Sequence, residues 1–134
     1  MMASTEGALA FIKGLGAVHA MSHAVGRFHE LNLHHGTLNA VLLPAVLRFN
    51  HAHVGEKYQR IKRAMGLDAG ADLADFISEL NQHLGLPANL AQMGVCDEHL
   101  EGLEDFAMAD LNTMTNPRQP KPQDYRQLFK DALR

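Results

Sequence analysis

Histidines are concentrated in one part of this 134-residue chain, where seven of the nine lie between His19 and His53. His19 and His23 are four residues apart in a segment of helical pattern, which places both side chains on one helical face. His34 and His35 follow after a short break. Two imidazoles on one helix and a third at the entrance of the next suit a divalent transition metal. The same spacing also arises by chance in histidine-rich chains, so the pattern alone leaves both interpretations open.

The segment that carries the first two histidines has apolar residues at helical intervals from Ala8 to Phe28. At 100° per residue, His19 and His23 fall near the stripe of Ile12 and Leu15, so both imidazoles are expected to face inward. Gly14 and Gly16 weaken the helix, and we expect a bend or break there. A plain structural role for His23, as a core imidazole hydrogen-bonded to a backbone carbonyl, is the alternative to a chemical one.

The elements that follow are also helical in pattern. A loop over 26–36 leads into an apolar helix over 37–50, and Pro44 predicts either two helices meeting there or one kinked helix. Further helices are predicted over 55–65, 72–84, 97–108 and 124–133, with a single turn over 90–95 and an extended link over 116–122. Acidic residues from Asp97 to Asp110 are interpreted as a solvated helix face. The prediction is an all-α bundle of about six helices forming one domain, 1–134.

Composition excludes several classes of function. A net charge of −3 and a pI near 6.3 give no basis for binding nucleic acid or an anionic membrane surface. No apolar run is long enough to span a bilayer, and no signal-peptide layout is present at the start. Cys96 is the only cysteine, so neither an internal disulfide nor a thiolate metal cluster can form. A cytoplasmic location is expected.

Several short motifs occur in an order that is typical of one enzyme family. They are Gly16-Ala17-Val18-His19-Ala20-Met21-Ser22-His23, Gly26, His35-Gly36, Asn39-Ala40-Val41, Leu43-Pro44, Arg48-Phe49-Asn50, Lys57-Tyr58, Arg60-Ile61, Met65-Gly66, Leu84-Gly85-Leu86-Pro87 and Asn116-Pro117-Arg118. With these residues the chain resembles the carboxy-terminal helical domain of the iron-dependent (group III) alcohol dehydrogenases. The resemblance covers nearly the whole chain.

The resemblance implies roles for three histidines. His19 and His35 correspond to two of the family's metal ligands, which bind Fe(II) or, in some members, Zn(II). His23 corresponds to a histidine beside the metal that assists proton movement. In the family a separate amino-terminal α/β domain binds NAD(P), and the metal polarises the alcohol oxygen while hydride passes to the cofactor.

The chain also departs from the family pattern. The resemblance implies that an aspartate and a further histidine of the metal site lie upstream of the position matching Met1. No glycine-rich dinucleotide-binding turn occurs in the sequence. Ala24 replaces the proline that usually follows the second histidine, and a longer loop brings in His29 and His34. The glycine register favours His35 over His34 as the ligand.

These observations predict the carboxy-terminal domain of an iron-containing alcohol dehydrogenase, which would be inactive alone and would bind metal weakly or not at all. Its substrates would be alcohols or aldehydes, and its partners the missing amino-terminal domain or a second copy of the chain. A different class of function is a small helical module that self-associates through an uncovered apolar face. A third is a stand-alone metal-binding protein that uses His19, His23 and His35.

Overall fold

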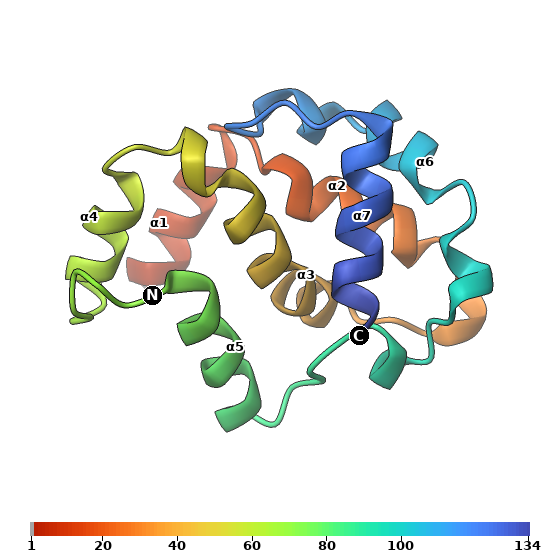
Figure 1. The fold of residues 1–134 in the computed structure, drawn as a ribbon, viewed down its shortest axis with the longest axis horizontal. Helices are drawn as coiled ribbons and strands as arrows, with labels where there is room; N and C mark the ends of the chain where they lie inside the picture. Colours follow the sequence, from red (N-terminus) through yellow and green to blue (C-terminus); the bar gives the residue numbers. More distant parts are fainter. Residues whose placement is uncertain (1) are drawn as a thin grey trace.

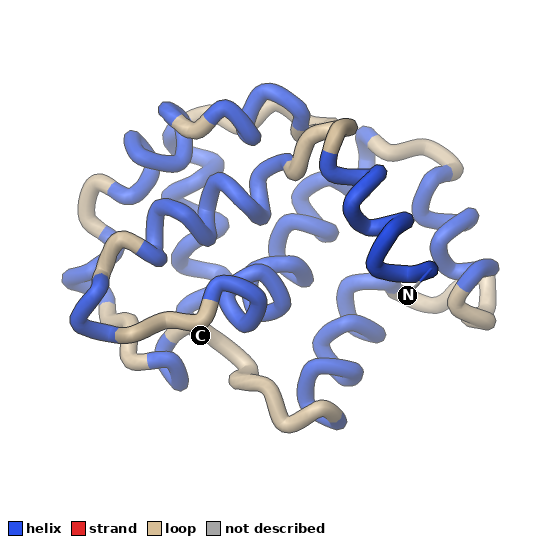
Figure 2. The backbone as a smooth tube through the Cα atoms, turned by 180° about the vertical axis from the view of Figure 1, so that it is seen from behind, coloured by secondary structure: helices blue, strands red, loops and turns tan. Residues whose placement is uncertain are grey.

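The structure, a computed structural model, describes residues 2–134, with the exception of the side chains of residues 3, 4, 10 and 11. The described residues form seven α-helices joined by loops and short 3₁₀ turns, and no strand occurs among them (Figures 1 and 2). The α-helices are α1 (Met2–Phe11), α2 (Gly16–Gly26), α3 (His35–Asn50), α4 (Lys57–Ala64), α5 (Leu73–His83), α6 (Leu103–Ala109) and α7 (Pro122–Leu133). The 3₁₀ turns are η1 (His29–Leu31), η2 (His51–His53), η3 (Ala91–Met93), η4 (Asp97–Leu100) and η5 (Leu111–Thr115). The all-α prediction is confirmed.

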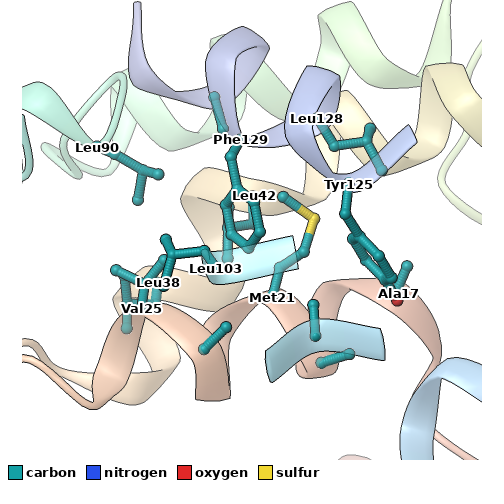
Figure 3. Close-up of a cluster of buried hydrophobic side chains, with 14 of the residues drawn as sticks. Ala17, Met21, Val25, Leu38, Leu42, Leu90, Leu103, Tyr125, Leu128 and Phe129 are labelled. Carbon is teal, nitrogen blue, oxygen red and sulfur yellow. The ribbon is translucent and has the colours of Figure 1, made fainter. Parts of the chain in front are cut away.

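The core lies where α2, α3, α6 and α7 meet (Figure 3). Its largest fully buried side chains are Met21 on α2, Leu38 and Leu42 on α3, Leu103 on α6, and Tyr125 and Phe129 on α7. Small residues of α2 let the other helices approach closely, because Ala17 and Ala20 are completely buried. Helix α3 packs against both α2 and α7, and Figure 1 shows α1, α4 and α5 toward one end of the molecule. None of the described helices has the length and apolarity needed to cross a bilayer.

The amino-terminal end of α2 is held by a segment about one hundred residues away. Asn116 is buried, and its Oδ1 accepts hydrogen bonds from the Ala17 N–H at 3.1 Å and from the Asn50 side chain at 3.1 Å. Its Nδ2 donates to Asn50 Oδ1 at 2.7 Å and to the Arg118 carbonyl at 2.6 Å. The Asn116 side chain thus satisfies a backbone N–H that the start of α2 leaves without a helical partner and links α2 to the end of α3. The hydrogen bonds between Asn50 and Asn116 thus connect two motifs that are far apart in the sequence.

Three details of the helix boundaries were open or wrong in the sequence prediction. The break between α1 and α2 is confirmed, and Gly14 and Gly16 both have positive φ there, at 85° and 67°. Of the two alternatives at Pro44, the structure shows a single helix, because α3 runs without interruption from His35 to Asn50. The predicted helix over 97–108 is instead η4 followed by α6, separated at Gly102, whose φ of 76° is left-handed.

Candidate metal centre

The structure brings His19, His23 and His35 together from two helices. A ring nitrogen of each lies within 4.8 Å of a ring nitrogen of the other two. His19 and His23 come from successive turns of α2, and His35 is the first residue of α3. Two predicted ligands and the predicted proton-handling residue are therefore neighbours in space.

The histidines face outward, contrary to the expectation from the apolar stripe. His19 is half-buried, and His23 and His35 are exposed. The expectation fails because α2 begins only at Gly16, so Ile12, which is 82% exposed, does not share a helix with the two histidines. The buried face of α2 is made of Met21 and small residues on the other side of the helix. The cluster consequently opens onto the surface, where a ligand could reach it.

His34 and His35 have different roles in the structure, which shows which of the two joins the histidine cluster. His34 is the N-cap of α3, and its Nδ1 accepts a hydrogen bond from the Thr37 N–H at 3.3 Å. Capping of this kind satisfies one of the unpaired donors at a helix start. His35 begins the helix and points to His19. The structure therefore places His35, and not His34, in the cluster.

The two Nε2 atoms of His19 and His35 are 3.0 Å apart, and their rings form an edge-to-face pair. Two imidazole nitrogens that each lie about 2.1 Å from one ion, at angles of 90° to 109°, are about 3.0 to 3.4 Å apart. The observed separation therefore fits a pair of ligands on one Fe(II) or Zn(II) ion. Protein sites for such ions use three or four ligands, so this pair could supply only part of such a site.

A buried serine sets the tautomer of His35. The Ser22 hydroxyl is completely buried, donates to the His19 carbonyl at 3.3 Å, and lies 3.1 Å from His35 Nδ1. Because its one proton is used on the carbonyl, its oxygen accepts from Nδ1–H. His35 then carries its proton on Nδ1 and keeps a lone pair on Nε2, which is the form that binds a metal through Nε2. Asn39 Nδ2, 3.2 Å away, also reaches this lone pair.

Replacement of this serine should weaken the site without disrupting the fold. We expect Ser22→Ala to reduce the affinity for Zn(II) about tenfold, since loss of a group that orients a ligand typically costs 10- to 100-fold. Ser78→Ala is the matched control, because the Ser78 hydroxyl bonds only to the Ala74 carbonyl on α5, remote from the histidines. Calorimetric titration of the three proteins measures the effect. Equal losses in both variants would contradict the role of Ser22.

Burial and neighbouring charge keep two of the imidazoles neutral. The pKa of His19 is lowered by burial, then by His35 and His23. The pKa of His35 is lowered by burial, then by His23 and His34. A metal binds neutral imidazole, so a lowered pKa extends binding toward more acidic pH.

The pH dependence of metal affinity tests this effect. Two histidines of ordinary pKa, about 6.5, lose about fourfold in affinity at pH 6.5 because each is then half protonated. With both pKa values lowered, we expect the loss of Zn(II) affinity between pH 7.5 and 6.5 to be smaller than fourfold and to increase at more acidic pH. Titrations at pH 7.5, 6.5 and 5.5 measure it. A fourfold loss already at pH 6.5 would show that the two groups titrate as ordinary histidines.

Asp110, which the acidic pattern predicts on a solvated helix face, contacts the histidine cluster instead. Asp110 Oδ2 lies 2.7 Å from His23 Nδ1, although 87 residues separate them. Burial raises the pKa of Asp110, but hydrogen bonds from His23 and Asn112 outweigh it, so the pKa lies below its ordinary value. Asp110 is therefore ionised at neutral pH. The interpretation of His23 as an imidazole bonded to a backbone carbonyl is not supported, because its described partner is this carboxylate.

Comparison with known proteins identifies the family of the chain. The profile of the Fe-containing alcohol dehydrogenase family, C-terminal, matches residues 1–133. A 4-hydroxybutyrate dehydrogenase of Cupriavidus necator is 42% identical over 140 residues, which cover 99% of this chain and 37% of that protein. A solved 1,3-propanediol oxidoreductase matches with a TM-score of 0.79 and 33% identity, over 89% of this chain and 33% of its own.

A solved iron-containing alcohol dehydrogenase from Thermococcus thioreducens has a TM-score of 0.76 and 34% identity over 88% of this chain and 32% of its own. The chain thus spans about a third of the length of the relatives that it matches. Sequence and fold agree over nearly all of its residues. The chain belongs to the Fe-containing alcohol dehydrogenase family and corresponds to its C-terminal part.

Proposed function

We propose that this chain provides part of the metal centre of a nicotinamide-dependent enzyme that interconverts alcohols and aldehydes. The observation that carries the proposal is the 3.0 Å separation of the Nε2 atoms of His19 and His35 within a chain of this family. Lewis-acid polarisation of the substrate oxygen is the chemistry that Fe(II) or Zn(II) supplies when bound. The family match favours this function over a self-associating helical module without catalysis, although self-association itself stays a prediction.

Each histidine has a distinct task in the proposal. His19 and His35 hold the metal through Nε2, and Ser22 fixes the tautomer of His35. His23 lies beside them, with its ring stacked on that of His35 at a centroid distance of 5.3 Å. Its Nδ1 is bound to Asp110, which leaves Nε2 to exchange a proton with the substrate hydroxyl.

The remaining parts of the active site come from outside these residues. An aspartate and a third histidine would complete the metal ligands, and a dinucleotide-binding domain would place NAD(P) against the substrate. The exposure of His23 and His35 supports this arrangement, since a catalytic centre excludes water only when something covers it.

A chimera provides the test. The chain would replace the matching segment of the Cupriavidus necator dehydrogenase, to which it is 42% identical. We expect the chimera with Fe(II) or Zn(II) to oxidise primary alcohols with NAD(P), and His23→Phe to lower kcat by 10²- to 10⁴-fold, the usual contribution of general acid–base catalysis.

Two controls accompany the chimera. The 134-residue chain alone should show no dehydrogenase activity. A chimera that binds NADH and metal but oxidises no alcohol would contradict the proposal. Turnover by the isolated chain would show that the division of the active site is wrong.

A further inference from the structure

The contact between Asp110 and His23 is more than a surface ion pair. The aspartate side chain is 16% exposed, whereas that of His23 is 49% exposed. The short Nδ1–Oδ2 distance of 2.7 Å joins a largely covered carboxylate to the open edge of the cluster. An exposed side chain without a partner adopts several rotamers. The hydrogen bond to Asp110 limits the rotation of the His23 ring.

Asp110 is itself held firmly. Its Oδ1 accepts the N–H and the Nδ2–H of Asn112, both at 2.8 Å, and the residue is the N-cap of η5. The same turn is tied to the core by Thr113, whose buried hydroxyl bonds to the Ala107 carbonyl and lies 2.7 Å from the Tyr125 hydroxyl. The carboxylate therefore presents Oδ2 from a fixed position on the core.

This arrangement determines where the proton of neutral His23 resides. An ionised carboxylate only accepts hydrogen bonds, so Nδ1 must donate to Oδ2. The neutral ring has one N–H, which is then on Nδ1, and Nε2 keeps its lone pair. Without Asp110, nothing in the described contacts of His23 would select this tautomer.

We propose that Asp110 is a positioning residue that holds His23 in the Nδ1–H tautomer and aims the lone pair of Nε2 at the substrate side of the histidine cluster. This inference deepens the proposed function and rests on it. When a substrate hydroxyl gives up its proton, the O–H bond breaks and an Nε2–H bond forms. The positive charge on the resulting imidazolium is then balanced by the Asp110 carboxylate, which remains ionised.

The variant Asp110→Asn makes a sharp test. Oδ1 is already occupied by two donors from Asn112, so the amide NH₂ must take the place of Oδ2. It would then donate to His23 Nδ1, and the ring would move its proton to Nε2, as happens when the aspartate that orients a catalytic histidine is replaced by asparagine. The amide still caps η5, because asparagine is as good an N-cap as aspartate.

Long-range ¹H–¹⁵N correlation spectra of the 134-residue chain at about pH 8.5, about two units above the ordinary histidine pKa, measure the tautomer directly. We expect Nδ1–H for His23 in the wild type and Nε2–H in Asp110→Asn. Asp105→Asn, which removes an exposed carboxylate of α6, should leave the wild-type pattern unchanged. Loss of packing alone would not invert a tautomer.

The outcome separates this inference from the metal proposal. Wild-type His23 with its proton on Nε2, or an unchanged tautomer in Asp110→Asn, would overturn the role of Asp110. The wild-type spectrum decides the point even if the variant does not fold. Zn(II) added to the same samples tests the metal site independently. Broadening or shift of the His19 and His35 resonances supports that site. If these resonances do not change, the metal proposal is contradicted, but the result on the tautomer of His23 is unaffected.

Discussion

The double variant His19→Ala, His35→Ala should lose measurable binding of Zn(II) and Fe(II). The double substitution removes the pair of imidazoles whose Nε2 atoms lie 3.0 Å apart, at ligand spacing. Loss of a group that merely orients a ligand costs 10- to 100-fold, so loss of two ligands should exceed about 100-fold. Anaerobic calorimetric titration against the wild-type chain, whose own binding should be weak, measures the difference.

The matched control for this variant is His51→Ala, His53→Ala. Both of these histidines are exposed and lie on η2, which follows the end of α3 opposite to His35. The control removes the same number of imidazoles, and we expect it to bind metal as the wild type does. Equal loss in the two double variants would mean that the ion binds surface histidines without selection.

The substitution Asn116→Ala should destabilise the protein by about 3 kcal/mol or more. Truncation removes all four hydrogen bonds of the buried amide and leaves the Ala17 N–H and the Asn50 side chain without these partners. Each buried polar group left unsatisfied costs about 1–3 kcal/mol. For a chain of this size the melting temperature should fall by about 10 °C or more, which differential scanning calorimetry measures.

Asn89→Ala serves as the comparison for Asn116→Ala, since Asn89 Oδ1 accepts one hydrogen bond, from the Gln92 N–H within a local turn. Its loss should cost about 1 kcal/mol. If the two variants melted at the same temperature, the hydrogen bonds of Asn116 between α2 and α3 would contribute no more to stability than the single bond of Asn89. Because α2 carries His19 and His23, this link also bears on the geometry of the site.

The sequence allowed correct prediction of the helical class. The three histidines that it singles out lie together in the structure, while their roles stay predictions. The positions of His19, His23 and His35 follow from a local motif and from the glycine after His35, which are both readable along the chain. The break at Gly14 and Gly16 was also predictable, because glycine readily adopts the positive φ found there.

The rest depended on contacts between distant segments. Asp110 and His23 are 87 residues apart, and nothing in an acidic stretch distinguishes the carboxylate that packs against α2 from those that face water. The one local signal is Asp-x-Asn, which is typical of an N-cap turn and does not point to histidine. Ser22 precedes His23 and reads as an ordinary polar residue, yet it is fully buried between His19 and His35.

The direction in which the histidines face could not be read from periodicity either. An apolar stripe indicates which residues share a face but not which face meets the rest of the protein. On α2 the alanines do so, together with Met21 and Val25. The seventh α-helix results from the break at Gly14 and Gly16, which separates α1 from α2, whereas the predicted helix over 97–108 contains one α-helix, α6, preceded by the turn η4.

Anomalous X-ray diffraction from crystals of the chain soaked with Zn(II) would test most directly whether His19 and His35 bind the same ion. The account predicts one ion about 2.0 to 2.2 Å from the Nε2 atoms of both residues. It also predicts that His23 remains hydrogen-bonded to Asp110 and does not enter the coordination shell. An ion bound by His29 or His34 in place of His35, or by His23 in place of His19, would contradict the account.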